Sequence, residues 1–222
     1  MFFSWANRLP EWIEVCPVNL PGRSKRMFEP AYLDMESLQV AMVPKLPLAD
    51  KPFAVFGHSL GAQIAFELAH RAHERYGIEP LHVFVSGCFA PHLDHPHPIH
   101  HLGDAEFMRE LRELGGVPRE VADDSELMEL MKPMLRADFT IAETYHRPPV
   151  RGVSCAMTAF AGEQDPIATV EAAGAWRDHT GGPFELKAYP GDHFFIHKVE
   201  DDLVRSTAST LGSHFERHVK RP

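Results

Sequence analysis

The pentapeptide Gly-His-Ser-Leu-Gly at positions 57–61 places one serine between two glycines and fits the pattern G-x-S-x-G. This pattern carries a nucleophilic serine when it follows a β-strand and opens a helix. An apolar run precedes the motif here and a helical stretch follows it, so we expect Ser59 to lie on a tight, strained turn. Glycines at both ends would relieve collisions in such a turn, and the amide of Leu60 would face a developing oxyanion. The alternative is a tight strand-to-helix turn without chemistry.

A serine nucleophile needs a base, and the base needs an acid that orients it. In proteins with this motif the order along the chain is serine, acid, histidine. Asp165 and His193 each lie in a turn just past a later apolar run, where a parallel strand would end. We therefore predict that Ser59, Asp165 and His193 form a catalytic triad. Glu163, two residues from Asp165, remains the alternative acid.

Short β-rich runs alternate with helical patterns, which predicts an α/β fold with a mainly parallel sheet. The predicted strands are Ile13–Val18, Phe53–Phe56, Leu81–Ser86, Cys155–Phe160 and Glu185–Tyr189. The predicted helices of this alternating part are Met35–Leu46, Leu60–Arg75, Val170–His179 and Asp201–Val219.

The segment 92–149 breaks this alternation, because it begins rich in histidine and then becomes purely helical. We predict one helix at Asp104–Leu114 and a second that begins near Asp123, with Glu126 completing a capping box. Such an insertion indicates a helical lid (92–149) over a core formed by residues 1–91 and 150–222. The alternative is an ordinary pair of sheet-covering helices, although a crossover of this length would be unusual.

The composition excludes several classes of protein. With 22 basic and 31 acidic residues the net charge is −9, which argues against a nucleic-acid-binding face. No apolar run is long enough to span a membrane, and the N-terminus does not resemble a secretory signal. The three cysteines, Cys16, Cys88 and Cys155, are predicted to be buried thiols of a reducing compartment. We expect a cytoplasmic protein.

Several longer stretches together resemble a known family. They are LPGRSKRMFEP (20–30), KPFAVFGHSLGA (51–62), PLHVFVSGCFAPHL (80–93), PIHHLGDAEFMRELRELGG (98–116), LMKPMLRADFTIAETY (130–145) and YPGDHFFI (189–196). In order and over nearly the whole chain, they resemble the type II thioesterases of nonribosomal peptide and polyketide synthesis. These are close kin of the medium-chain thioesterase of fatty acid synthesis.

The resemblance implies an α/β-hydrolase fold with a helical lid. We expect no cofactor and no metal. It implies hydrolysis of acyl groups from the phosphopantetheine arm of a carrier protein, in an editing role. The family's serine, acid and histidine fall on Ser59, Asp165 and His193. The lid would form the acyl channel, with Met131, Met134 and Leu135 binding flexible aliphatic chains. We expect a monomer. The alternatives are a medium-chain thioesterase of fatty acid synthesis and a non-catalytic protein that binds carriers.

The chain departs from the family pattern at its start. The family begins with an apolar strand and a glycine-rich turn, whereas Met1–Trp5 aligns with the helix that follows that turn. The turn supplies a second oxyanion amide, whose loss can lower turnover about 100- to 1,000-fold. The missing strand would lie between two interior strands and pair with both. We expect that the true start lies upstream of Met1, and the alternative is a short form with little activity.

Three other groups of side chains were considered. The histidines at 92, 95, 97, 100 and 101 suggest a metal site, but prolines interrupt their spacing and no cysteine completes a set of ligands. Arg23, Lys25 and Arg26 form a basic loop that would meet an acidic surface or phosphate of a carrier, or simply be solvated. Cys88 follows a predicted strand without a base beside it, so we do not expect a thiol nucleophile.

Overall fold

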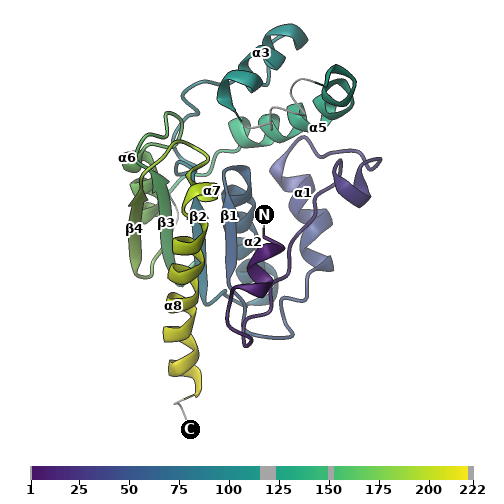
Figure 1. Cartoon of the computed structure of the whole chain (residues 1–222). Helices are drawn as coiled ribbons and strands as arrows, with labels where there is room; N and C mark the ends of the chain where they lie inside the picture. Colours follow the sequence, from purple (N-terminus) through teal and green to yellow (C-terminus); the bar gives the residue numbers. More distant parts are fainter. Residues whose placement is uncertain (1, 116–123, 150–152, 220–222) are drawn as a thin grey trace.

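A parallel sheet of four strands forms the centre of the computed structural model, which describes residues 2–115, 124–149 and 153–219 (Figure 1). The strands are β1 (Val55–His58), β2 (His82–Ser86), β3 (Ala156–Gly162) and β4 (Phe184–Tyr189), in the order β1-β2-β3-β4. All neighbouring pairs are parallel. The predicted α/β class is therefore confirmed, and these strands lie within two residues of their predicted bounds.

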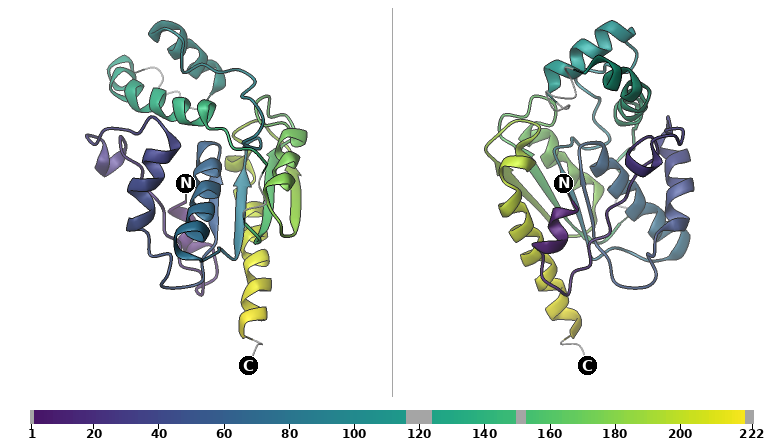
Figure 2. Two further views of the ribbon diagram at one scale, coloured as in Figure 1. Left: turned by 180° about the vertical axis from the view of Figure 1, so that it is seen from behind. Right: turned by 45° about the vertical axis from the view of Figure 1, so that its right-hand side comes forward.

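Helices cover both faces of the sheet, as a parallel sheet requires (Figures 1 and 2). Along β2, Val83 and Val85 join the cluster with α1 (Met35–Met42) and α2 (Leu60–Tyr76). Phe84 between them joins the opposite cluster with α8 (Glu200–Val219). This alternation follows from the two-residue period of a strand. Because both faces are buried, all five residues of β2 are buried and its three central residues, 83–85, are apolar.

The predicted helices of the core are found with two changes. The helix predicted for 35–46 ends at Met42, because Pro44 carries no N–H, and continues as the 3-10 helix η3 (Val43–Lys45). The helix predicted for 170–179 is divided into α6 (Val170–Gly174) and the 3-10 helix η4 (Ala175–His179). Gly174 lies at the division, consistent with the low helix propensity of glycine. The remaining short helices are η1 (Ser4–Asn7), η2 (Ser24–Arg26) and α7 (Phe195–Lys198).

Helices α3 (Asp104–Leu114) and α5 (Ser125–Thr144) follow β2 in the chain and lie above the carboxyl ends of the strands (Figures 1 and 2). They pack on each other through Phe107, Met108 and Met128. The prediction that Asp123 caps the second helix is wrong. Asp124 is the cap and accepts a hydrogen bond from the Leu127 amide, so Glu126 is not at the position that a capping box needs. Asp123 itself lies outside the described residues.

The predicted strand Ile13–Val18 is not formed. Its residues pair with no strand in the described part of the chain, and a segment without a ladder partner is not a strand however apolar it is. Cys16 in this segment is exposed, so the prediction of a buried thiol is wrong there, whereas Cys88 and Cys155 are buried as predicted. Among the described residues, none of the helices combines the length and the apolar character of a membrane span.

Candidate active site

Ser59 lies between the end of β1 and the start of α2, in a backbone conformation that non-glycine residues rarely adopt (φ 54°, ψ −126°). Its amide donates a 2.8 Å hydrogen bond to the carbonyl oxygen of Ser86 at the end of β2. A Cβ atom at position 57 would lie 1.9 Å from the carbonyl oxygen of Gly61, so Gly57 is required for this turn. A Cβ atom at position 61 would meet nothing within 4 Å, so the predicted collision at Gly61 is absent.

His193 lies in the loop after β4, and its Nε2 is 3.0 Å from the Oγ of Ser59. Gly162 at the end of β3 allows this loop to approach, since a Cβ atom there would lie 2.5 Å from the carbonyl oxygen of Asp192. The loops after β3 and β4 are joined further by Gln164, whose side-chain oxygen accepts a 2.6 Å hydrogen bond from the amide of Gly191. The histidine is therefore held between two connected loops.

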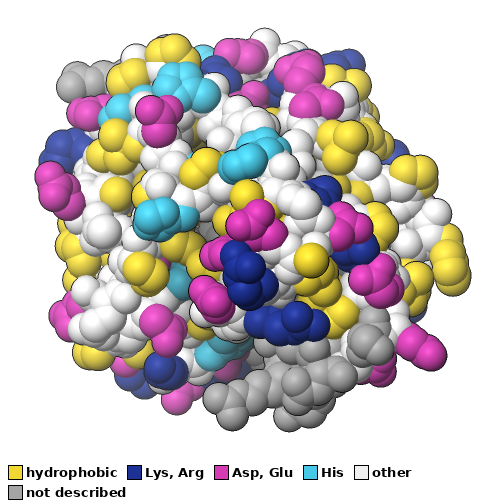
Figure 3. Space-filling view, turned by 90° about the horizontal axis from the view of Figure 1, so that it is seen from above, with side chains coloured by type: hydrophobic (Ala, Val, Ile, Leu, Met, Phe, Trp, Pro, Cys, Tyr) yellow, Lys and Arg dark blue, Asp and Glu magenta, His cyan; other side chains and the backbone are white. Residues whose placement is uncertain are grey.

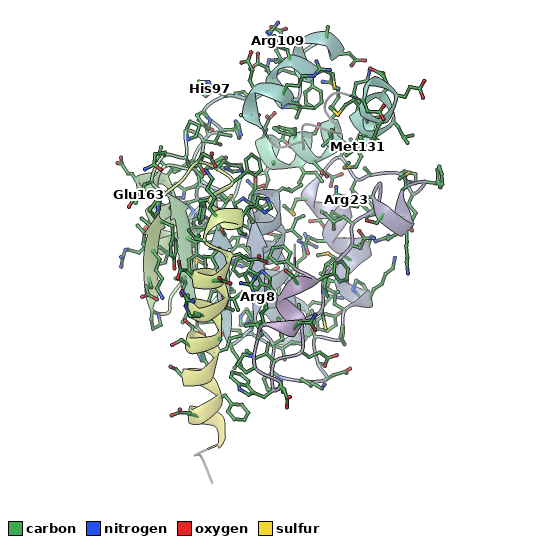
Figure 4. The ribbon with its side chains drawn as sticks, in the orientation of Figure 1. Arg8, Arg23, His97, Arg109, Met131 and Glu163 are labelled. Carbon is green, nitrogen blue, oxygen red and sulfur yellow. The ribbon has the colours of Figure 1, made fainter. Side chains whose placement is uncertain are left out.

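Asp165 lies in the loop after β3 and accepts hydrogen bonds at both carboxylate oxygens. Oδ2 is 2.8 Å from Nδ1 of His193, while Oδ1 accepts from the amides of Ile167 (2.8 Å) and Ala168 (2.9 Å). Burial by itself would raise the pKa of Asp165, but the hydrogen bonds from His193 and the two amides outweigh burial and lower it. Glu163, the alternative acid, is exposed at the periphery of the molecule (Figure 4).

The contacts define what this arrangement can do chemically. An ionised Asp165 accepts hydrogen bonds only, so His193 Nδ1 carries the proton in this contact and Nε2 is left to accept a proton from Ser59. Ser59 is also the N-cap residue of α2, and the amide of Leu60 belongs to the first turn of that helix. The first amides of a helix have no partner within the helix and favour negative charge.

His58 is a neighbour of this site to which the sequence analysis gave no role. Its Nδ1 is 3.0 Å from the Oγ of Ser86, and its Nε2 is buried without a hydrogen-bond partner. Burial, and then the charge of His193, lower the pKa of His58 to about 3. The sequence signal was its position directly before the serine, on the strand that carries the motif.

The three predicted acyl-binding residues all belong to α5 but lie in different surroundings. Leu135 packs within the cluster between α3 and α5. Met134 contacts the core loop after η1, since a Cβ atom on Gly22 would lie 2.8 Å from its Cγ. Met131 is half-buried, one turn nearer the outer end of α5 (Figure 4).

Two cations of the predicted basic loop are engaged within the protein. A guanidinium nitrogen of Arg23 lies 2.5 and 2.6 Å from the two carboxylate oxygens of Asp138 on α5. Arg26 donates to the carboxylate of Glu29 and to the carbonyl oxygen of Asn19. The third cation of the loop, Lys25, is exposed and has no ion-pair partner among the described residues. A carrier-binding role of the basic loop would therefore depend mainly on Lys25.

The histidines of the segment 92–101 do not converge. His92 Nδ1 is 2.8 Å from Nε2 of His179, whereas His100 Nδ1 is 2.5 Å from a carboxylate oxygen of Glu143. Histidine side chains lie at several separate places on the face seen from the lid side (Figure 3). No group of three or more potential ligands is arranged to hold a metal in the part of the chain that the structure describes.

A surface groove of about 660 Å³ lies at the other end of the sheet. It is lined by the first residues of β2 and β3, including His82 and Ala156, and by His214 of α8. Ser59 and His193 do not line it, so the groove is separate from the site at the carboxyl ends of the strands.

The chain is similar to several known proteins over most of its length. A Brevibacillus parabrevis protein named linear gramicidin dehydrogenase LgrE is 45% identical over 222 residues, which cover 96% of this chain and 83% of that protein. The thioesterase PikA5 of Streptomyces venezuelae is 38% identical over 232 residues, which cover 100% of this chain and 81% of that protein. The solved structure of the RedJ thioesterase from prodiginine biosynthesis in Streptomyces coelicolor superposes with a TM-score of 0.85 at 37% identity, covering 94% of this chain and 80% of that one. The family described as "Thioesterase domain" matches residues 1–213, and the chain is a member of this thioesterase family.

Proposed function

We propose that this protein is an editing thioesterase that hydrolyses acyl groups from the phosphopantetheine arm of carrier proteins in a peptide or polyketide synthase. The observation that carries the proposal is the line of contacts from Ser59 through His193 to Asp165. Its support is the family membership, the thioesterase activity named for PikA5 and the prodiginine biosynthetic pathway named for RedJ. LgrE is named a dehydrogenase, but the present sequence contains no G-x-G-x-x-G fingerprint for a dinucleotide.

In the proposed reaction, Ser59 Oγ attacks the thioester carbonyl while Nε2 of His193 takes its proton. Asp165 stabilises the resulting imidazolium, and the Leu60 amide stabilises the oxyanion. As the C–S bond breaks, the imidazolium of His193 gives its proton to the sulfur, and the phosphopantetheine arm leaves as a free thiol. A thiol with a pKa near 8.5 departs more readily than an alcohol. Water then attacks the acyl-serine with His193 as base, which releases the acid and restores Ser59.

We assign the role of a lid to residues 92–149, over a core formed by residues 1–91 and 150–222. The position of α3 and α5 above the strand ends supports this assignment. Met131 and Met134 are the acyl-binding candidates on α5, since methionine adapts to flexible aliphatic chains. Leu135 is a weaker candidate because it packs against α3. We further propose a cytoplasmic monomer without a cofactor.

The test is the hydrolysis of acyl groups from a phosphopantetheinylated carrier protein. The free thiol that hydrolysis releases is measured over time. Ser59→Ala should abolish turnover and labelling by a fluorophosphonate probe. Ser209→Ala, on the exposed surface of α8, is the matched control and should retain both. Hydrolysis by Ser59→Ala at the wild-type rate would refute the mechanism.

Substrate profiles test the finer part of the proposal. Acetyl, medium-chain and aminoacyl groups are loaded on the same carrier and compared by kcat/KM. An editing enzyme should release short and aminoacyl groups at comparable rates, whereas a chain-terminating enzyme of fatty acid synthesis should prefer medium chains strongly. Absence of both turnover and probe labelling would instead support a non-catalytic carrier-binding protein.

A further inference from the structure

The side chain of His58 fills the space between the end of β2 and the proposed catalytic histidine. Its ring centroid is 5.3 Å from that of His193 and 5.9 Å from that of Phe195. Nδ1 is 3.0 Å from the Oγ of Ser86, which is fully buried. The ring thus has a hydrogen-bond partner on β2 and aromatic neighbours on the side of the β4 loop.

Gly87 makes room for this ring. A Cβ atom at position 87 would lie 2.4 Å from Cε1 of His58, and Gly87 has a positive φ of 53°. Both the space and the backbone conformation therefore require glycine at this position. The fit between Gly87 and the ring fixes where the ring can lie, in addition to the contact with Ser86.

We infer that His58 is a positioning residue for His193: held by Ser86 and Gly87, its ring supports the imidazole that receives the proton of Ser59. This inference rests on the proposed function, since it assigns His58 to the same site. The ring of His58 makes no hydrogen bond to the serine hydroxyl or to the acid, so its effect on the reaction passes through His193.

The charge state of His58 suits this role. The ionisable groups that face it are His193 and His197 from the β4 loop and α7, and Asp165 from the β3 loop. Burial, and then the charge of His193, keep His58 neutral at neutral pH. A neutral ring supports the imidazole without placing a second positive charge beside the imidazolium that forms during the reaction.

A double-mutant cycle tests the inference. His58→Phe keeps an aromatic ring but removes Nδ1, and Ser86→Ala removes its partner. Each should lower kcat about tenfold, the effect of one lost hydrogen bond, with KM within twofold of wild type. Because Ser86 acts through His58, adding Ser86→Ala to His58→Phe should lower kcat no further. His146→Phe, an exposed histidine, is the control and should leave kcat unchanged.

The outcomes are distinguishable. Equal kcat values for wild type and His58→Phe, or full additivity in the double variant, would overturn the positioning role while leaving the proposed function intact. A wild-type protein that hydrolyses no carrier-bound acyl group would overturn the proposed function. In that case the rate of fluorophosphonate labelling still tests His58, because labelling requires an activated Ser59 but no carrier protein. If His58→Phe does not fold, His58→Leu, which also removes Nδ1, is combined with Ser86→Ala to measure the same coupling.

Discussion

The change Asp165→Asn should nearly abolish turnover while leaving the fold intact. The two amides of Ile167 and Ala168 both donate to Oδ1, so the asparagine oxygen must occupy that position to accept from them. The amide nitrogen then faces Nδ1 of His193, 2.8 Å away in the wild-type contact. Two donors cannot share this contact, so the imidazole changes tautomer and presents Nε2–H to Ser59.

A histidine in that tautomer cannot accept the serine proton. The same substitution in a serine–histidine–aspartate triad lowers kcat by about 10⁴, or about 5 kcal/mol of transition-state stabilisation. The assay is steady-state hydrolysis of an acyl-pantetheine thioester, with urea unfolding to verify that stability is retained. Glu163→Gln removes the exposed neighbouring carboxylate and is the control that should stay within twofold of wild type. Turnover by Asp165→Asn within tenfold of wild type would refute the assigned role.

Three further predictions concern stability, measured by urea unfolding. Gly57→Ala should destabilise the protein by more than about 3 kcal/mol because its Cβ meets backbone, whereas Gly61→Ala should be tolerated. Asp138→Ala should destabilise by about 2 kcal/mol, and adding Arg23→Ala should recover part of this loss because no unpaired guanidinium remains. Burial and the charge of His214 lower the pKa of His82 to about 3, so its contribution to stability is complete above about pH 6.5 and is lost as the pH falls towards 3. His82→Gln should therefore reduce the loss of stability between pH 7 and pH 5 by about 1–2 kcal/mol.

Each of these has a result that contradicts it. Equal effects of alanine at 57 and 61 would show that the carbonyl of Gly61 can move aside. A double variant at 23 and 138 that is no more stable than Asp138→Ala would show that the unpaired, half-buried guanidinium carries no penalty. A His82→Gln variant with the wild-type pH dependence would show that His82 is protonated as easily in the folded protein as in the unfolded chain.

Strands β1–β3 were predictable because each coincides with a short, mostly apolar run, whereas β4 alternates apolar with charged residues, the other pattern typical of a strand. The error at β1 has a simple cause: Phe53 is apolar and lies next to the strand, but pairing with β2 begins only at Val55. The segment Ile13–Val18 shows the limit of such reasoning, since apolar sequence does not supply a hydrogen-bonding neighbour. The choice between Asp123 and Asp124 as cap depended on one residue of register, which periodicity does not resolve.

The convergence of Ser59, Asp165 and His193 could be anticipated, because the carboxyl ends of parallel strands lie along one edge of a sheet. The engagement of Arg23 by Asp138 could not, since these residues are 115 positions apart and no local pattern links them. The same holds for His58 and Ser86, whose contact depends on how β1 and β2 align. Chemistry at strand ends is visible in sequence, whereas the side chains that support it depend on register.

Pro133 divides α5 into two mechanically different halves. The inner half, from Pro133 to the C-terminal end of α5, is fixed to α2. Gln63 of α2 donates to the carbonyl oxygen of Ala142, and Tyr145, the residue after α5, donates to Glu67 of α2. Pro133 cannot donate to the carbonyl of Glu129, so the helix lacks one stabilising bond where the outer half begins. Bending at this joint would move Met131 while leaving the anchored half in place. Such bending would change the space beside this proposed acyl-binding residue without unfolding any helix.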